Sequence, residues 1–265
     1  MLAADTDLAE TLRGAKDALA HIPELRSLML TGSIPMGAFS KAMSDIDLVG
    51  VTSQPVTELA NPVRKAFGSI AGPYAEKLGV MLLDQATVES GTARGIVLNA
   101  ADPQAMQECE PHEIDLVMLR KYSALMFGID FRSHLPKLEE PDVIDDIIGY
   151  VVDRLLQRAG ESRPISSDKI TNLVFVMSRC LYTLANGTLA TKPEAARWLM
   201  DRVGGTESLR ALADLAGEFS QWYQHGLPEN RDEARLADRF AEAVRFYPAA
   251  VDNIRMTYGH SRDVD

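Results

Sequence analysis

Cysteine is scarce in this chain, which has only Cys109 and Cys180 among 265 residues. The two are not spaced as metal ligands, and two cysteines cannot form a disulfide framework. The five histidines stand singly, with no pair spaced to bind zinc from one helix face. No basic stretch followed by an apolar one opens the chain, and no apolar run approaches the roughly 18 residues of a membrane span. We therefore expect a protein of the reducing cytoplasm, with no zinc site and no contact with a membrane.

Basic residues are also few, since 27 lysines and arginines face 38 aspartates and glutamates, for a net charge of -11. This balance disfavours general binding to a phosphate backbone, so we expect no nucleic-acid partner. An acidic surface attracts small cationic molecules, although the same charge can serve only to keep a protein soluble. Nothing in the composition indicates an oligomeric state.

The apolar pattern divides the chain into a mixed part and a helical part. Strands are predicted over residues 25–31, 46–51, 78–83 and 95–98, and helices over 7–20 and 55–70. After about residue 112 only helical periodicity remains, over 113–127, 142–158, 168–186, 193–203, 207–223 and 229–256. We predict an α+β fold, with a mixed sheet and its helices in residues 1–135 and an all-α helical bundle in residues 136–265.

One short segment carries residues suited to phosphate chemistry: Gly32-Ser33, and then Ser44-Asp45-Ile46-Asp47 at the start of the second predicted strand. Asp45 and Asp47 are two residues apart, so both carboxylates should point to one face of that strand. Carboxylates so close repel each other and are stable as a pair when they share a divalent cation. Magnesium, which takes one or two carboxylates together with phosphate oxygens, suits this pair.

The Gly-Ser pair suits a phosphate group. Gly32 lets a backbone approach a phosphate closely, and the Ser33 hydroxyl can bond its oxygens. The stretch between Ser33 and Ser44 is long enough for a short helix, whose N-terminus would favour an anion. A lone Asp-x-Asp is common, and Asp45 alone could be a strand or turn cap. The ordered series of strand, Gly-Ser, Ser-Asp-x-Asp and strand instead favours a site for a nucleoside triphosphate with magnesium.

This arrangement resembles that of the DNA-polymerase-beta-like nucleotidyltransferase superfamily. The runs Asn172–Leu184 and Asn186–Trp198 further resemble the helical domain of the aminoglycoside (streptomycin/spectinomycin) adenylyltransferase family, which confers antibiotic resistance. Glu113–Leu119 is similar to that family's linker helix. The resemblance spans most of residues 25 to 200.

The resemblance implies a two-domain enzyme that moves AMP from ATP to a hydroxyl of a small cationic, aminoglycoside-like acceptor. Gly32, Ser33 and Ser44 would bind ATP, and Asp45 and Asp47 would hold Mg²⁺. Arg179 and Lys192 match the family's arginine and lysine that reach the nucleotide phosphates. Read without the resemblance, both are ordinary helix-surface cations.

The family's third carboxylate, its general base, is replaced in this chain by Gly79. Glu76 and Asp84 are the nearest acids and are the candidate bases. Each is an odd number of residues from Gly79, so in a regular strand both point to the opposite face unless a bulge intervenes. Glu76 could equally be a solvated charge and Asp84 a turn residue. The alternative function is therefore a nucleotide-binding regulatory protein or weakened enzyme that lacks this carboxylate.

The family's acceptor-binding stretch corresponds to residues 160–169, which contain no tryptophan. Glu161 and Asp168 could bind a cationic acceptor there. We favour Asp168 as the N-cap of the helix that follows, because Ser-Ser-Asp precedes an apolar helical pattern.

Overall fold

A computed structural model of the chain describes residues 5–90, 94–102, 106–139, 143–145, 148–149, 165–202 and 207–258. The chain forms two compact units. The first consists of residues 1–39 and 44–138, and the second of residues 40–43 and 139–265. The main boundary falls at Leu138–Glu139, and the short segment 40–43 belongs to the second unit although its neighbours in sequence belong to the first.

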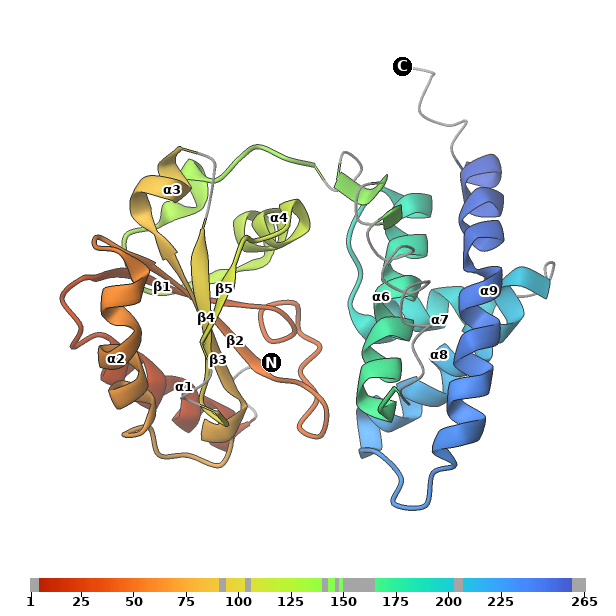
Figure 1. The fold of residues 1–265 in the computed structure, drawn as a ribbon, viewed down its shortest axis with the longest axis horizontal. Helices are drawn as coiled ribbons and strands as arrows, with labels where there is room; N and C mark the ends of the chain where they lie inside the picture. The colour runs from red at the N-terminus through yellow and green to blue at the C-terminus, as the bar shows by residue number, and fades with distance from the viewer. Residues whose placement is uncertain are drawn as a thin grey trace. The chain divides into compact units, whose positions relative to one another are not determined.

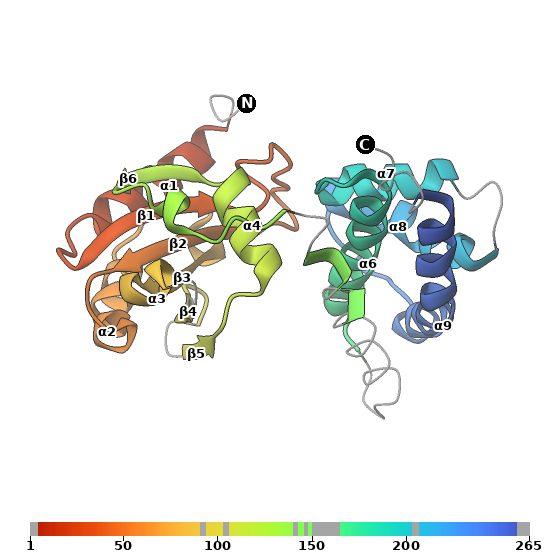
Figure 2. The ribbon, with the colours of Figure 1, turned by 90° about the horizontal axis from the view of Figure 1, so that it is seen from above.

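The first unit is built on a mixed sheet whose six described strands lie in the order β5-β4-β3-β2-β1-β6 (Figures 1 and 2). Strands β2 and β3 are parallel, and every other neighbouring pair is antiparallel. The strands are β1 Leu25–Thr31, β2 Ile46–Thr52, β3 Leu78–Asp84, β4 Gly95–Asn99, β5 Met106–Cys109 and β6 Ala124–Gly128. The four strands expected from the sequence are confirmed, and β5 and β6 were not expected.

Helices cover both faces of this sheet because its strands are apolar on both sides. The helices are α1 Thr6–Leu19, α2 Val56–Phe67, α3 Gln85–Glu89 and α4 Glu113–Tyr122, with single 3₁₀ turns η2 Ala75–Lys77 and η3 Phe131–His134. Helices α1 and α2 pack on the face that carries Leu28 and Leu48. Helix α4 and η3 pack on the other face, which carries Met29 and Val49. Alternate residues of the central strands β2 and β3 therefore belong to two different cores.

The expectation that strands end at residue 112 is wrong, because β6 follows α4 directly. Its sequence, Ala-Leu-Met-Phe-Gly, begins with residues that favour helices and is separated from α4 by Ser123 alone. It becomes a strand through pairing with β1, from Ser27↔Gly128 to Leu30↔Ala124. That pairing is a long-range contact, and local periodicity in the sequence contains no information about it.

The second unit is a helical bundle around one apolar core (Figures 1 and 2). Its long described helices are α6 Ser167–Asn186, α7 Lys192–Arg202, α8 Glu207–His225 and α9 Glu233–Tyr258. The helix expected over 142–158 falls mostly on residues outside those described. The predicted class, a mixed sheet with helices followed by a helical domain, is confirmed. Among the described helices, none has both the length and the apolarity needed to cross a membrane.

Helix α7 begins with a capping box, and this gives a first testable expectation. The Glu194 carboxylate accepts hydrogen bonds from the Thr191 hydroxyl (2.7 Å) and the Thr191 N–H (2.9 Å), and these bonds lower the pKa of Glu194 from its ordinary 4.5. Glu194→Gln should lower the free energy of unfolding by roughly 0.5 kcal/mol at pH 7, because a charge is lost from the helix N-terminus. A group whose pKa is depressed by folding stabilises the protein above its unfolded pKa and stops doing so as the pH falls through the folded value. The difference between wild type and variant should therefore shrink below about pH 4.5.

Urea unfolding at pH 7, 5 and 4 measures this difference. Glu229→Gln, which changes an exposed carboxylate in the loop before α9, is the matched control and should give the same stability as wild type at every pH. A wild-type advantage over Glu194→Gln that stays constant down to pH 4 would contradict the capping role of the charge.

Candidate active site

The Gly32-Ser33 turn lies against Asp47. Strand β1 ends at Thr31, which pairs directly with Asp47 of β2. Gly32 then adopts a left-handed backbone, with φ 73°. A Cβ added to Gly32 would overlap Oδ2 of Asp47 and lie 3.3 Å from its Cγ. Both the backbone conformation and the close carboxylate therefore require glycine at this position.

The loop after Ser33 is a series of turns. Ala38 N–H donates to Ser33 O (2.8 Å), and Gly37 N–H donates to Ile34 O (2.9 Å). The short helix expected here is not formed, because Gly37 takes a left-handed φ of 74°, which a right-handed helix does not contain. The expected anion site at a helix N-terminus is thus replaced by a turn.

The Ser33 hydroxyl is a buried polar atom with no hydrogen-bond partner within the described chain. A buried hydroxyl without a partner costs roughly 1–3 kcal/mol, so such an atom in a native site calls for an explanation. A phosphate oxygen held beside Gly32 would provide the missing partner. The turn at Gly32 and Ser33 therefore has a geometry that fits a phosphate group.

The two predicted metal ligands lie on one exposed face at the start of β2. Asp45 and Asp47 are exposed, whereas Ser44, Ile46 and Leu48 between and beside them are buried. This alternation directs both carboxylates to the same side of the strand. No group of three or more His, Cys, Asp or Glu residues able to hold a metal occurs in the part of the chain that the structure describes. A pair of carboxylates suits Mg²⁺ completed by phosphate oxygens and water.

Asp47 belongs to a row of four residues that runs across the sheet. Thr31 pairs with Asp47, Asp47 with Gly79, and Gly79 with Asn99, on β1, β2, β3 and β4 respectively. Directly paired residues of neighbouring strands point to the same face. The next row on that face, two residues further along each strand, is Met29, Val49, Met81 and Val97. Met29, Val49 and Met81 belong to the core under α4, so the site lies on the α4 face, at the end of the sheet where β1 finishes and β2 begins.

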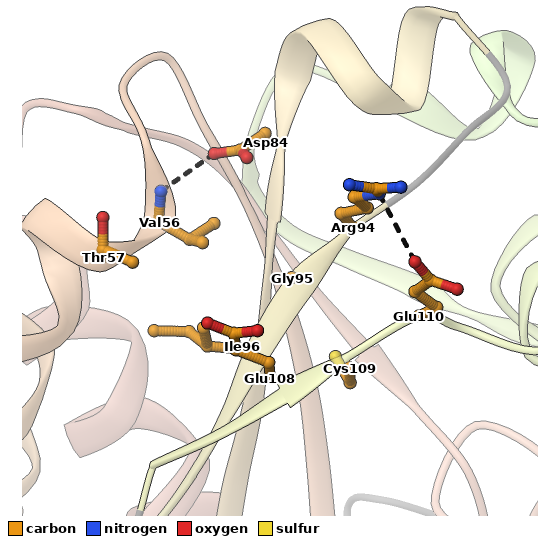
Figure 3. A pocket seen from close by; sticks show the side chains of 9 residues that line it. All are labelled: Val56, Thr57, Asp84, Arg94, Gly95, Ile96, Glu108, Cys109 and Glu110. Carbon is orange, nitrogen blue, oxygen red and sulfur yellow. Dashed lines mark hydrogen bonds and ion pairs between the residues drawn. The ribbon is translucent and has the colours of Figure 1, made fainter.

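Gly79 stands directly opposite Asp47, at the position where the sequence lacks a third carboxylate. Asp84 lies at the far end of β3, where it pairs with Thr52, five residue pairs from Asp47. Its Oδ1 accepts the N–H of Val56 (2.8 Å) and so caps α2 on the opposite face of the sheet (Figure 3). The structure therefore does not bring Asp84 to the metal-binding pair, and its carboxylate has a structural role.

A pocket of about 450 Å³ lies at this other end of the sheet, between the start of α2 and strands β4 and β5 (Figure 3). Asp84, Cys109 and the ion pair of Arg94 with Glu110 (3.4 Å) line it. Partial burial, and to a lesser degree the charge of Asp115, raise the pKa of the Cys109 thiol, which opposes its use as a nucleophile. The pocket is separate from the row that contains Asp47.

Glu76, the other candidate base, lies in η2 immediately before β3 and is exposed. Leu78 pairs with Ile46, so Glu76 lies at the same end of the sheet as Asp45 and Asp47. Its neighbour Lys77 donates from Nζ to the carbonyl oxygen of Ser44 (3.2 Å). This contact fixes the backbone just before Asp45. Sequence reasoning missed Lys77, and only the pairing of β2 with β3 could have indicated it.

In the second unit, the predicted phosphate-binding cations Arg179 and Lys192 lie on neighbouring segments. Arg179 of α6 donates from Nε to Ala190 O (2.9 Å), two residues before Lys192. Lys192, at the start of α7, donates from Nζ to Oδ1 of Asn172 on α6 (3.0 Å). Asn172 and Arg179 are seven residues apart, hence on one side of that helix. The Lys192 ammonium also lies 5.8 Å from the ring centre of Phe175 and 5.9 Å from that of Tyr223. The structure therefore gathers the two cations at the junction of α6 and α7.

The acceptor-binding stretch is described only in part. Glu161 lies outside the described residues. The N-cap of α6 is Ser166, and Asp168 lies within the first helical turn, so the prediction that Asp168 is the cap was wrong by two residues. An aspartate in that turn still interacts favourably with the helix dipole.

The segment between the two motifs of the first unit is held by the helices of the second. The Ser40 hydroxyl donates to the carbonyl oxygen of Tyr223 on α8 and accepts the N–H of Met43 (3.1 Å). Met43 packs against the core of the helical unit. Since Ser44 and Asp45 follow at once, the chain leading into the predicted metal-binding pair is held by two hydrogen bonds, one from Ser40 and one from Lys77.

This fold, a mixed sheet carrying a Gly-Ser turn and an Asp-x-Asp strand and followed by a helical bundle, is shared with a solved adenyltransferase. The chain is similar to the crystal structure of spectinomycin adenyltransferase AAD(9) from Enterococcus faecialis, solved with ATP and spectinomycin. The TM-score is 0.66 and the identity 16%, over 92% of this chain and 99% of that one. The resemblance expected from the sequence is thereby confirmed at the level of the fold.

Another solved structure, the complex of CdnC with HORMA-deltaN from E. coli MS115-1, matches at a TM-score of 0.32 and 15% identity, over 94% of this chain and 84% of that one. No protein-family model and no curated protein sequence matches the chain.

Proposed function

We propose that this protein is a metal-dependent nucleotidyltransferase that moves AMP from ATP to a hydroxyl of a small cationic acceptor resembling an aminoglycoside. The observation that carries the proposal is the contact of Gly32 with the Asp47 carboxylate, beside the buried Ser33 hydroxyl that has no partner in the described chain. A turn that would bind phosphate and a strand that would bind a metal thus adjoin at one end of the sheet. The similar fold of an adenyltransferase solved with ATP and spectinomycin supports ATP and this class of acceptor.

The residues divide the work of holding the nucleotide. The Gly32 backbone and Ser33 hydroxyl would bind phosphate oxygens, and the buried Ser44 would support the strand start that carries Asp45 and Asp47. These two aspartates would hold Mg²⁺, which when bound offsets the charge of the phosphates. Arg179 and Lys192 would contribute positive charge to the phosphates, which suits groups already gathered at one helix junction.

In the proposed reaction the acceptor's hydroxyl oxygen forms a bond to the α-phosphorus of ATP. The bond from that phosphorus to the oxygen leading to the β-phosphorus breaks, and pyrophosphate leaves. The hydroxyl proton must pass to a base. Of the two acids considered, Glu76 is at this end of the sheet and remains our candidate, whereas Asp84 caps α2.

Gly79 supports a second candidate function. Since no carboxylate stands opposite Asp47 on β3, a regulatory protein or weakened enzyme that binds ATP without transferring AMP is consistent with the same site. This alternative predicts nucleotide binding with no release of pyrophosphate.

The two free cysteines, Cys109 and Cys180, suit the reducing cytoplasm that we propose for either function.

Calorimetric titration of ATP with Mg²⁺ into the wild-type protein, followed by measurement of pyrophosphate release, tests the proposal. The acceptors are spectinomycin, streptomycin and further aminoglycosides. We expect binding that requires Mg²⁺ and pyrophosphate release that requires an acceptor. Binding without release for any acceptor would favour the regulatory alternative. No binding by folded protein would contradict both functions.

A further inference from the structure

The Asn99 side chain of β4 lies over Gly79 of β3, the position at which the third carboxylate is missing. Gly79 of β3 pairs directly with Asn99, the last residue of β4. A Cβ built on Gly79 would lie 2.9 Å from Oδ1 of Asn99. The Asn99 side chain is thus folded over Gly79 and occupies space that a side chain at position 79 would need.

The register places this amide beside the metal-binding pair. Asp47, Gly79 and Asn99 form one row on the α4 face of the sheet. Neighbouring strands are about 4.8 Å apart, so the Cα atoms of Asp47 and Asn99 are separated by roughly 10 Å, with only the glycine between them. The Asp47 carboxylate is directed toward Gly32 on one side, and the Asn99 Oδ1 lies over Gly79 on the other. Asn99 is exposed, so a ligand can reach it from solvent.

We infer that Asn99 binds the acceptor, with its amide oxygen accepting a hydrogen bond from the hydroxyl that attacks ATP. This inference rests on the proposed function. A carboxylate at this point would both orient the hydroxyl and take its proton, whereas an amide accepts the hydrogen bond without taking up the proton. Asn99 therefore orients the acceptor oxygen toward the α-phosphorus. As the new P–O bond forms and pyrophosphate leaves, the proton passes to a different base, for which Glu76 is the candidate.

Two substitutions remove the amide oxygen from this place by different routes. Asn99→Ala deletes it, and Gly79→Ala displaces it, because the added Cβ would come within 2.9 Å of Oδ1. Both should lower pyrophosphate release with spectinomycin about tenfold or more and leave the Kd for Mg·ATP unchanged within about twofold. Asn61→Ala, in an exposed position on α2, is the matched control and should behave as wild type.

Asn99→Asp keeps the shape and adds a carboxylate to the row. It should release pyrophosphate faster than wild type by about tenfold or more, with spectinomycin or with water alone as acceptor, because the new group can also take the proton. Its rate should fall at low pH as that carboxylate becomes protonated. Asn61→Asp adds the same charge elsewhere in the first unit and should leave the rate unchanged.

The outcomes separate this inference from the proposed function. If wild type does not bind Mg·ATP, the proposed function fails. If wild type binds Mg·ATP but Asn99→Asp is no faster than wild type and Asn61→Asp with either acceptor, the role of Asn99 is overturned. Release by Asn99→Ala equal to wild type, with an unchanged KM for spectinomycin, would also overturn it.

Discussion

Asp47→Asn should reduce pyrophosphate release by about a thousandfold while leaving the fold intact, which is the largest effect on turnover that we expect from one substitution. Removing one well-placed electrostatic contact in an active site typically costs a hundred- to a thousandfold in rate. Asp47 has two neighbours in the proposed chemistry: Asp45, two residues earlier in the chain, which would share the metal, and Gly32 of the turn that would bind phosphate. The amide of asparagine keeps the size of the side chain but loses the charge that holds Mg²⁺.

The measurement is the Mg²⁺ dependence of ATP binding together with the rate of release. Asp47→Asn should lose the Mg²⁺-dependent part of the binding, and its stability should stay within about 0.5 kcal/mol of wild type because the residue is exposed. Asp252→Asn removes an exposed carboxylate from α9 and serves as the control for charge alone. If Asp47→Asn keeps more than a tenth of wild-type release, Asp47 is not a ligand of the reacting complex.

Gly32→Ala should abolish measurable Mg·ATP binding through geometry alone, without altering any charge. The new Cβ would overlap Oδ2 of Asp47, so either the carboxylate or the turn must move. The left-handed φ of 73° adds roughly 1–2 kcal/mol of backbone strain for any residue with a Cβ. We therefore expect a loss of about 1–3 kcal/mol in unfolding free energy together with a Kd for Mg·ATP raised at least a hundredfold.

Gly187→Ala separates the effect of backbone strain from the effect of displacing the Asp47 carboxylate. Gly187 is the C-cap of α6 in the helical unit and has a similar φ of 70°, so alanine there imposes the same backbone strain. We expect a similar loss of stability and no loss of Mg·ATP affinity. Weakening of Mg·ATP binding by Gly187→Ala as large as that caused by Gly32→Ala would show that instability, and not the displaced carboxylate, is responsible.

Local pattern was sufficient for most of the fold. The apolar run Leu25–Thr31 became β1 with the expected bounds, and the predicted helices of the second unit were found within a few residues wherever the structure describes them. Strand β5 was missed because it is four residues long and polar, and β6 was missed because its residues were read as the end of the helix before it. Strand β6 is defined by pairing with β1, which is distant in sequence, and that information is absent from periodicity.

The site could be predicted as far as its residues are adjacent in the chain. Asp45 and Asp47 share a face because alternation in a strand is a local property, and Gly32 and Ser33 adjoin them through a single strand pairing. From the sequence, Asp84 and Glu76 were equally good candidates for the base. The strand register then placed Asp84 five residue pairs from Asp47, where it caps α2. Asn99 could not be found from the sequence, since only the pairing of β4 with β3 brings it to Gly79.

The four residues 40–43 also bear on how this chain can be divided. A fragment ending at Leu138 would contain the whole sheet and both motifs of the first unit, yet it would lack the Tyr223 carbonyl that accepts the Ser40 hydroxyl and the helical core that buries Met43. The reciprocal fragment starting at Glu139 would lack Ser40 and Met43 themselves. No single cut yields two complete units, because residues 40–43 belong to the helical unit, whereas the residues before and after them belong to the first unit.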